Sequence, residues 1–191
     1  MKKKAPTRGA QLRYLEAGLE VLGSKGYAGL KLATVCEAVG ATTGSFYHAF
    51  PNWAEYTSAL IRHWRTEKSD RFIGSAREIA DPIERLAFLV EIALRLPHAS
   101  EAAIRVWAAL DPSVQAIQIE ADEERRAFIA EAYFEATNDR ALAEQYATVA
   151  MFLLVGYESG THQSPEALAW AFHVFVDKGL SENPGRAATL D

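Results

Sequence analysis

The chain has 191 residues, 49% of them hydrophobic and 24% charged, which indicates a folded globular protein and excludes a disordered one. No apolar run reaches the roughly 18 residues of a membrane-spanning helix. None follows the basic start Lys2-Lys3-Lys4, so we expect no secretory signal. The single cysteine, Cys36, excludes an internal disulfide and a cysteine-rich metal site. We therefore expect a cytoplasmic protein with no membrane partner.

The net charge of −5 is unevenly distributed along the chain. Residues 1–65 carry nine basic and four acidic side chains, a net +5, whereas residues 66–191 carry 11 basic and 21 acidic ones, a net −10. A basic head on an acidic body is typical of a protein whose first part meets a polyanion such as DNA. An uneven solvated surface explains the same charges equally well, so charge alone leaves both interpretations open.

The first part of the chain predicts four helices. Leucines spaced along one helix face predict a first helix that ends near Gly23–Gly26. A short second helix is stopped by Gly40, and a third spans Thr42–Phe50. Asn52 then caps a fourth helix, which we expect to continue to about residue 71.

Five further helices are predicted, most of them beginning at a capping residue or at a proline in the first helical position. We expect them at about residues 81–96, 100–108, 113–136, 139–160 and 165–180. No segment shows the period-two alternation of a strand. The predicted fold class is all-α with about nine helices. A three-helix, helix-turn-helix DNA-binding head occupies residues 1–52, and an effector-binding and dimerisation domain occupies residues 53–191.

The segment Leu32–His48 has the layout of a helix-turn-helix. This motif needs two short helices that cross sharply at a small residue and a third helix that braces them. Gly40 suits the turn, because glycine adopts the positive φ that other residues avoid. Thr42 can cap the helix after the turn and also meet phosphate, and we expect Phe46 and Phe50 to pack inward.

Small polar side chains occupy the start of the helix after the turn. Thr43 and Ser45 allow close approach to base edges, although small helical residues often serve only as spacers. Tyr47 and His48 are expected to face outward, where their OH and NH groups suit phosphate oxygens. A partly buried tyrosine and a solvated histidine at a helix end are the alternatives.

Taken together, residues 8–60 resemble the DNA-binding head of the tetracycline-repressor (TetR) family. The shared features are a glycine-aromatic pair, a glycine turn and a threonine-x-glycine-x-aromatic-tyrosine run, carried by Gly26-Tyr27, Gly40, Thr42, Gly44, Phe46, Tyr47, His48 and Phe50. The resemblance implies a homodimer that binds double-stranded operator DNA and a small-molecule effector. We expect DNA contacts from Lys31, Thr42, Thr43, Ser45, Tyr47 and His48.

Three positions depart from the family pattern. Trp53 stands where many members place a lysine that touches backbone phosphate. Lys31 stands where a threonine often begins the second helix, and we expect it to replace part of the missing phosphate charge. Cys36 stands where a small alanine is usual, and we expect it to be a small buried hydrophobe and not a redox sensor.

The effector pocket is expected among the middle helices, and the apolar composition there predicts an apolar or aromatic small molecule. Each candidate is also consistent with plain core packing. The candidates are Phe88, Ile92, Trp107, Phe128, Tyr133, Phe152 and Tyr157.

The last two helices resemble the pair that forms a four-helix dimer interface in this family, with an intrachain core as the alternative. The expected interface residues are Phe152, Val155, Gly156, Ser159, Phe172, Phe175 and Val176.

The sequence thus predicts a ligand-responsive DNA-binding transcriptional regulator, a repressor that its effector releases from the operator. The alternative is a helical small-molecule-binding or interaction protein with a degenerate DNA-binding head. We predict no enzymatic activity, because no paired nucleophile and base, paired carboxylates or phosphate-binding loop is evident. The histidines are scattered, so we assign no metal and no cofactor.

Overall fold

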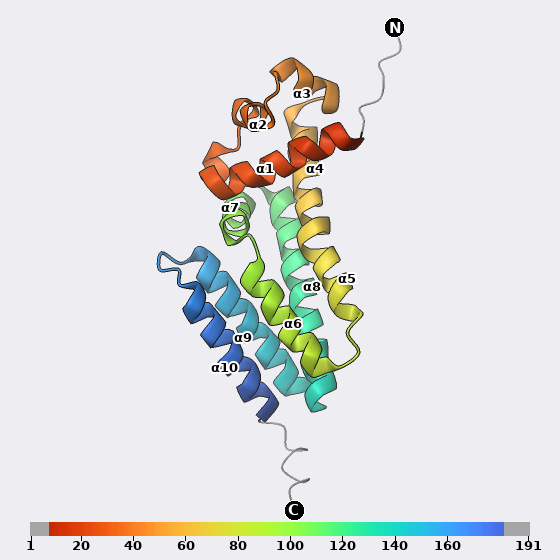
Figure 1. Cartoon of the computed structure of the whole chain (residues 1–191), viewed down its shortest axis with the longest axis vertical. Helices are drawn as coiled ribbons and strands as arrows, with labels where there is room; N and C mark the ends of the chain where they lie inside the picture. The colour runs from red at the N-terminus through yellow and green to blue at the C-terminus, as the bar shows by residue number, and fades with distance from the viewer. Residues whose placement is uncertain (1–7, 182–191) are drawn as a thin grey trace, which may run out of the picture. The chain divides into compact units, whose positions relative to one another are not determined.

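The structure is a computed structural model that describes residues 8–181, apart from the side chains of residues 68 and 69 (Figure 1). Over this range it contains no strand, and its elements are α1 Arg8–Gly29, α2 Leu32–Val39, α3 Thr43–Ala49, α4 Trp53–Arg65, a π-helical turn Thr66–Asp70, α5 Arg71–Arg77, α6 Pro82–Arg95, α7 His98–Ala108, α8 Pro112–Thr137, α9 Arg140–Ser159 and α10 Pro165–Ser181. The predicted all-α fold class is confirmed. Lys2, Lys3 and Lys4 lie outside the described residues. None of the described helices is long and apolar enough to cross a membrane.

The described residues form ten α-helices where the sequence predicts about nine. The difference arises after Arg65, where the backbone enters the π-turn Thr66–Asp70 before α5 begins, so the predicted fourth helix is divided in two. The first helix also continues past its predicted end to Gly29, across a kink at Gly26 with φ 65° and ψ −177°.

The chain divides into two compact units. The first unit comprises Met1–Glu67 and Pro97–Gln118, and the second comprises Lys68–Leu96 and Ile119–Asp191. The predicted domain boundary at residue 52 was placed directly after the helix-turn-helix and took only that motif into account. The compact units differ from it because α4 and α7 both pack against α1.

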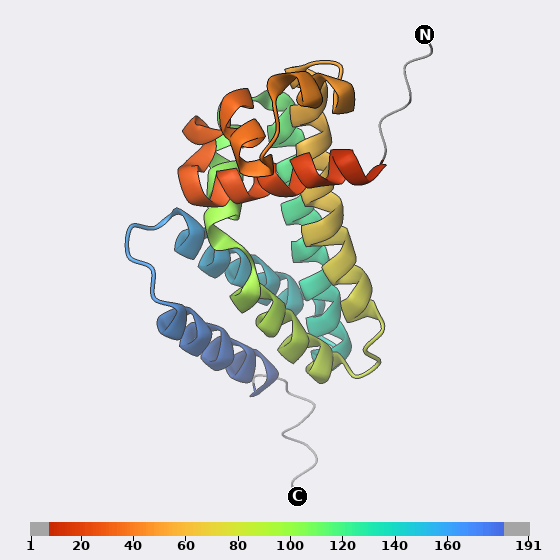
Figure 2. The same cartoon turned by 45° about the horizontal axis from the view of Figure 1, so that its top comes forward.

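In the first unit α2 and α3 lie on one side of α1 and α7 lies on the other (Figures 1 and 2). Two buried hydrogen bonds fix α4 in this unit. Tyr56 Oη donates to the Tyr14 carbonyl oxygen at 3.0 Å, and Trp64 Nε1 donates to Glu101 Oε1 at 2.7 Å. Because the side chains of Tyr56 and Trp64 are fully buried, each bond satisfies a donor that water cannot reach. The brace that the helix-turn-helix requires is therefore α1 together with α4.

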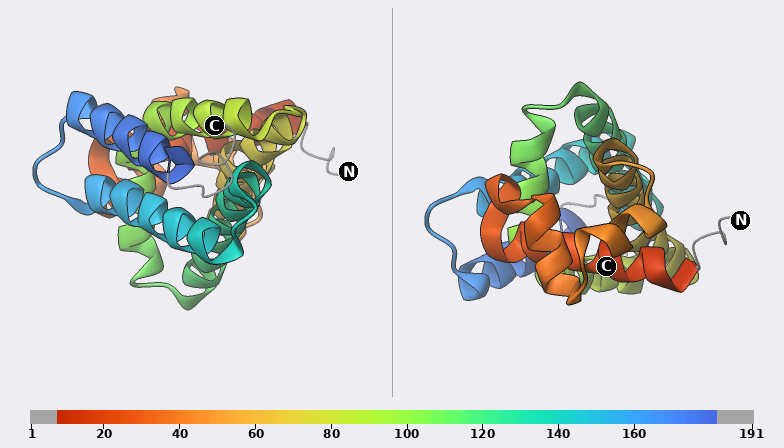
Figure 3. Two further views of the ribbon diagram at one scale, coloured as in Figure 1. Left: turned by 90° about the horizontal axis from the view of Figure 1, so that it is seen from below. Right: turned by 90° about the horizontal axis from the view of Figure 1, so that it is seen from above.

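The second unit is built on α10, which packs against α6 and against α9 (Figure 3). Its core includes Val90, Ala150, Leu154, Leu168 and Phe172. A neighbouring cluster contains Leu86, Ala132, Tyr133, Ala143 and Tyr146. The inward sides of α6, α8, α9 and α10 are thus apolar, as the helical periodicity predicts.

The turn between α2 and α3 depends on a backbone conformation that favours glycine. Gly40 ends α2 with φ 68° and ψ 37°. The Gly40 N–H donates to the Glu37 carbonyl oxygen, and the Ala41 N–H donates to the Cys36 carbonyl oxygen, both at 2.9 Å. These bonds satisfy carbonyl groups that a helix end otherwise leaves without partners.

Replacing Gly40 with alanine is expected to lower the free energy of unfolding by about 1–2 kcal/mol, because a Cβ is strained in the left-handed region. Gly44→Ala is the matched control. It lies inside α3, its added Cβ would meet only Thr42 Oγ1 at 3.6 Å, and alanine favours helix. Urea unfolding followed by circular dichroism measures both variants, and equal losses of stability would contradict the role given to Gly40.

Candidate functional site

An aromatic cluster holds α3 in place. The helix has seven residues, too few to be stable alone, so its position depends on packing. Phe46 is fully buried, and its ring centroid lies 5.5 Å from that of Tyr14 and 5.3 Å from that of Tyr56, edge-on in both cases. Phe50, 4% exposed, packs edge-on against the same two tyrosines. The predicted inward packing of both phenylalanines is confirmed.

Two hydrogen bonds fix the ends of α3. At its start, Thr42 Oγ1 accepts from the Ser45 N–H at 3.2 Å, which is the predicted cap. At its other end, Gln11 Nε2 on α1 donates to the Ala49 carbonyl oxygen at 2.8 Å. The helix therefore has a defined start and a defined end as well as a defined inner side.

The other side of α3 is exposed and polar. The side chains of Thr42, Thr43, Ser45, Tyr47 and His48 all lie at the surface, and Tyr47 is 51% exposed. No acidic residue occurs within α3. The predicted outward orientation of these residues is confirmed, and the surface offers hydroxyl groups and one imidazole. Their contact with DNA stays a prediction.

The charge around α3 is balanced. Residues 8–60 hold four basic and four acidic side chains. The predicted positive excess of residues 1–65 therefore comes from Lys2, Lys3, Lys4, Arg62 and Arg65. Lys31 is exposed at the N-cap of α2, but Glu37 is exposed on the same helix. Residues 8–60 thus offer few cations to a polyanion, and Lys31 is one of them.

Trp53 has a structural explanation. It is the first residue of α4, it is partly buried, and its ring centroid lies 4.9 Å from that of Tyr56 and 5.9 Å from that of Phe46. Asn52 caps the same helix by accepting from the Glu55 N–H at 2.8 Å. Trp53 thus extends the aromatic cluster under α3.

Cys36 is buried, as predicted, with 4% of its surface exposed. Burial in apolar surroundings raises the pKa of its thiol above the ordinary value, because it disfavours the charged thiolate. Reactivity requires the thiolate, so this position suits a small hydrophobic side chain.

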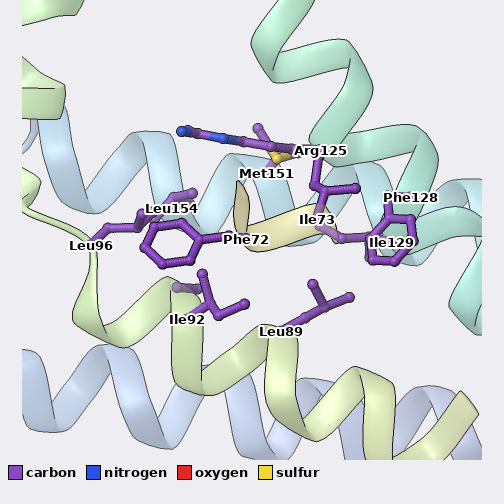
Figure 4. Close-up of a pocket in the computed structure, with 11 residues that line it drawn as sticks. Phe72, Ile73, Leu89, Ile92, Leu96, Arg125, Phe128, Ile129, Met151 and Leu154 are labelled. Atoms are coloured by element: carbon purple, nitrogen blue, oxygen red, sulfur yellow. The ribbon is translucent and has the colours of Figure 1, made fainter. Parts of the chain in front are cut away.

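The second unit contains a partly open apolar cavity between α5, α6, α8 and α9 (Figure 4). Its lining residues are Phe72, Ile73, Leu89, Ile92, Ala93, Leu96, Arg125, Phe128, Ile129, Met151 and Leu154. A second, also partly open, cavity lies between α6, α8, α9 and α10. The two adjoin, because Leu89, Ala93, Ile129, Met151 and Leu154 line both.

Three of the seven predicted effector residues line these cavities. Ile92 and Phe128 line the first, and Tyr133 lines the second. Phe88 is partly buried, lies beside the lining residue Leu89 on α6 and lines neither cavity.

The structure places the other three predicted effector residues elsewhere. Trp107 belongs to the first unit, where it stacks on Tyr27 with the ring centroids 5.5 Å apart. Phe152 is 68% exposed, and Tyr157 packs at the edge of the core around Leu154. Helical spacing identified these residues as apolar but not the side of the helix that each occupies.

Several lining residues were not predicted from the sequence. Phe72 and Ile73 lie on α5, which was not expected as a separate helix. Arg125 is 9% exposed and contributes the one charged side chain among the lining residues of the two cavities. In the sequence, Arg125 lies on the same side of a helix as Ala121, Phe128 and Ala132. A lone arginine on an otherwise apolar side could have identified it as a cavity residue. Over the described residues no cluster of three metal-ligating side chains occurs.

The outer side of α9 and α10 carries exposed apolar residues. Phe152 and Trp170 are each 68% exposed, Val174 is 47% exposed, and Gly156 and Ser159 also lie at the surface. Phe152, Gly156 and Ser159 thus lie on the side that the predicted interface requires.

Three other predicted interface residues point inward, and this corrects their assignment. Phe172 is 4% exposed and, with Phe175 and Val176, lines the second cavity. Periodicity alone selected the wrong stripe of α10, because aromatic residues occupy both of its sides. Trp170 and Val174, four residues apart, mark the outer stripe. Val155 is partly buried.

Residues 15–55 match the family model described as bacterial regulatory proteins, tetR family. The similarity to this family is thus shown for the segment that contains the helix-turn-helix. The matched segment includes the whole of α2 and α3 and the cluster members Phe46, Phe50 and Trp53, whereas Tyr14 and Tyr56 lie just outside it. Comparison with curated proteins gives no match for this chain.

Solved structures share the fold of this protein over nearly their whole length. A candidate transcriptional regulator from Saccharomonospora viridis in complex with choline has a TM-score of 0.74 at 19% identity, over 88% of this chain and 96% of its own. A TetR transcription regulator from Haloarcula marismortui has a TM-score of 0.71 at 16% identity, over 89% and 97%. AibR in complex with isovaleryl coenzyme A and operator DNA has a TM-score of 0.64 at 16% identity, over 85% and 95%.

The thiol of Cys36 is expected to resist modification in the folded protein. Ellman's reagent at pH 8 should react with the native chain at least about 100-fold more slowly than with the urea-unfolded chain, because burial blocks access and disfavours the thiolate. The absorbance of the released product measures both rates. Rapid reaction of the native protein would show that the thiol is accessible.

Proposed function

We propose that this protein is a ligand-responsive transcriptional regulator of the tetR family that binds double-stranded operator DNA through α3. A small, mainly apolar effector in the cavities of the second unit would release it, so that it acts as a repressor in the cytoplasm. One observation carries the proposal: α3 is anchored by buried aromatic rings on one side and presents only small polar side chains, Tyr47 and His48 on the other.

The chemistry of α3 supports DNA as the partner. Thr43 and Ser45 carry hydroxyl groups that suit base edges, and Tyr47 and His48 carry donors that suit phosphate oxygens. Lys31, at the start of α2, adds a cation. AibR, which shares the fold, was solved with operator DNA.

The cavities of the second unit support a small-molecule effector. Their linings are almost entirely apolar, which matches the usual composition of small-molecule sites. Two proteins of the same fold were solved with choline and with isovaleryl coenzyme A. An effector can change the DNA affinity only by the factor by which it binds one conformation more tightly than the other. The proposed release from DNA therefore requires that the effector bind the DNA-bound conformation more weakly than the free one.

The exposed side of α9 and α10 supports a homodimer. Phe152 and Trp170 present large aromatic surfaces to solvent, and aromatic residues are enriched in the cores of protein interfaces. The small residues Gly156 and Ser159 allow close approach of a second helix pair. In a symmetric dimer two copies of α3 can meet successive turns of one face of DNA, about 34–36 Å apart.

The alternative is a helical ligand-binding protein whose head has lost its affinity for DNA. The loss of the phosphate-binding lysine at Trp53 and the balanced charge of residues 8–60 favour it. The two functions differ in what substitutions on α2 and α3 do. Under the alternative such substitutions are silent for DNA, whereas under the proposal they weaken binding.

Tyr47→Phe is expected to weaken operator binding about fivefold, because one hydrogen bond to phosphate contributes about 1 kcal/mol. Lys31→Gln should reduce the slope of log K against log salt by about 0.9, since one fewer counterion is released. Fluorescence anisotropy with DNA that flanks the gene measures both quantities.

Lys25→Gln on α1 is the matched control for the lysine substitution, because it removes an exposed cation of the head outside α2 and α3. It should leave the salt slope unchanged. If Lys25→Gln, Lys31→Gln and Tyr47→Phe all changed DNA binding equally little, the result would favour the degenerate head. The absence of salt-sensitive, specific DNA binding by the unmodified chain would favour it as well.

Trp170→Glu is expected to convert the dimer to a monomer at micromolar concentration, because it places a charge in the centre of the apolar interface. Leu110→Glu is the control, since Leu110 is equally exposed, at 70%, but belongs to the first unit. Sedimentation equilibrium measures the association of both variants. Dimerisation of Trp170→Glu as tight as that of the unmodified chain would place the interface elsewhere.

A further inference from the structure

One residue that lines the second cavity has a buried hydroxyl group without a hydrogen-bond partner in the protein. Tyr133 lines this cavity, its side chain is 1% exposed, and its Oη makes no hydrogen bond. A buried hydroxyl group without a partner is costly, so a ligand that supplies an acceptor there gains affinity. In the first unit Tyr56 Oη is bonded to a carbonyl oxygen, and Tyr14 Oη also has no partner but Tyr14 lines neither cavity.

The surroundings of Tyr133 are otherwise apolar. The remaining lining residues of the cavity are aliphatic residues, one methionine and two phenylalanines: Leu86, Leu89, Val90, Ala93, Ile129, Ala150, Met151, Leu154, Phe172, Phe175 and Val176. None of them carries a charge or a strong hydrogen-bonding group. Burial among them raises the pKa of the Tyr133 hydroxyl, so at neutral pH this hydroxyl remains protonated and can donate.

The ring of Tyr133 is held firmly. Its centroid lies 5.3 Å from that of Tyr146, which in turn lies 4.6 Å from that of Phe175. Gly179 on α10 closes the other side, because a Cβ there would approach Tyr133 Cε1 to 2.8 Å and Tyr146 Cε1 to 2.7 Å. Only glycine allows α10 to pack so closely, and the packing limits the movement of the Tyr133 ring.

We propose that the effector is an uncharged, mainly apolar molecule with a carbonyl-type acceptor, and that this acceptor receives a hydrogen bond from Tyr133 Oη in the second cavity. An ion is disfavoured there, because a carboxylate in a hydrocarbon lining carries a large desolvation penalty that one hydroxyl does not offset. A pure hydrocarbon leaves the hydroxyl without a partner. An aromatic or branched ketone or ester meets both conditions, and its apolar part can extend into the adjoining cavity.

The inference rests on the proposed function in one respect, which is that it calls the bound molecule the effector. Binding of a molecule to the cavity is measured without DNA. Acetophenone and α-methylstyrene form a matched pair of probes, because they have nearly the same shape and differ in a carbonyl oxygen. Tyr133→Phe removes only the hydroxyl group. Tyr146→Phe is the matched control, since the adjacent Tyr146 is not a lining residue.

Isothermal titration calorimetry should show that Tyr133→Phe binds acetophenone about three- to tenfold more weakly than the unmodified chain, the usual contribution of one hydrogen bond. Its affinity for α-methylstyrene should be unchanged or higher. Tyr146→Phe should keep the ratio of the two affinities found for the unmodified chain. The ligand-free Tyr133→Phe variant should also melt at a higher temperature, because a buried group without a partner has been removed.

Three results would overturn the inference. One is an equal affinity of Tyr133→Phe and the unmodified chain for acetophenone, which includes the case that neither binds it. The second is a lower melting temperature of the ligand-free Tyr133→Phe variant, which would mean that the hydroxyl has a partner within the protein. The third is tighter binding of octanoate than of acetophenone, lost in Arg125→Met and retained in Tyr133→Phe, which would assign an anionic effector to the first cavity. If the protein failed only to bind DNA, the proposed function would be overturned, but the inference about ligand binding in the second cavity would stand.

Discussion

The packing of Phe46 between Tyr14 and Tyr56 is the interaction on which the head depends. A seven-residue helix has no stability of its own, so the buried rings beneath α3 decide which of its sides faces solvent. The hydrogen bond from Tyr56 to the Tyr14 carbonyl oxygen joins α4 to α1 at the same place. The exposed hydroxyl groups of α3 are therefore a consequence of aromatic packing, to which Trp53 also contributes.

Much of the head could be predicted from its sequence because its signals are local. Gly40 ends a helix only in a conformation that favours glycine, Thr42 bonds an N–H three residues away, and Phe46 and Phe50 are four residues apart on one side. Each of these constraints acts within a few residues. The charge of the surface was harder to predict than its shape. The count over residues 1–65 included three lysines that lie outside the described part of the chain.

The second unit was less predictable because its helices are apolar on more than one side. On α10 the sequence offers Phe172, Phe175 and Val176 on the inner side and Trp170 and Val174 on the outer side. Periodicity identifies both stripes as apolar, but only tertiary contacts with α6 and α9 decide which is buried. The π-turn after Arg65 had no clear signal either, so Phe72 and Ile73 were missed as cavity residues.

The two apolar sides of α10 give one helix two roles. A molecule in the second cavity would contact Phe172, Phe175 and Val176, while Trp170 and Val174 would meet a second copy of the chain. Because a packed helix moves as a unit, displacement of the inner side also displaces the outer one. Binding energies coupled in this way are reciprocal, so an effector that loosens the dimer must bind the monomer more tightly than the dimer.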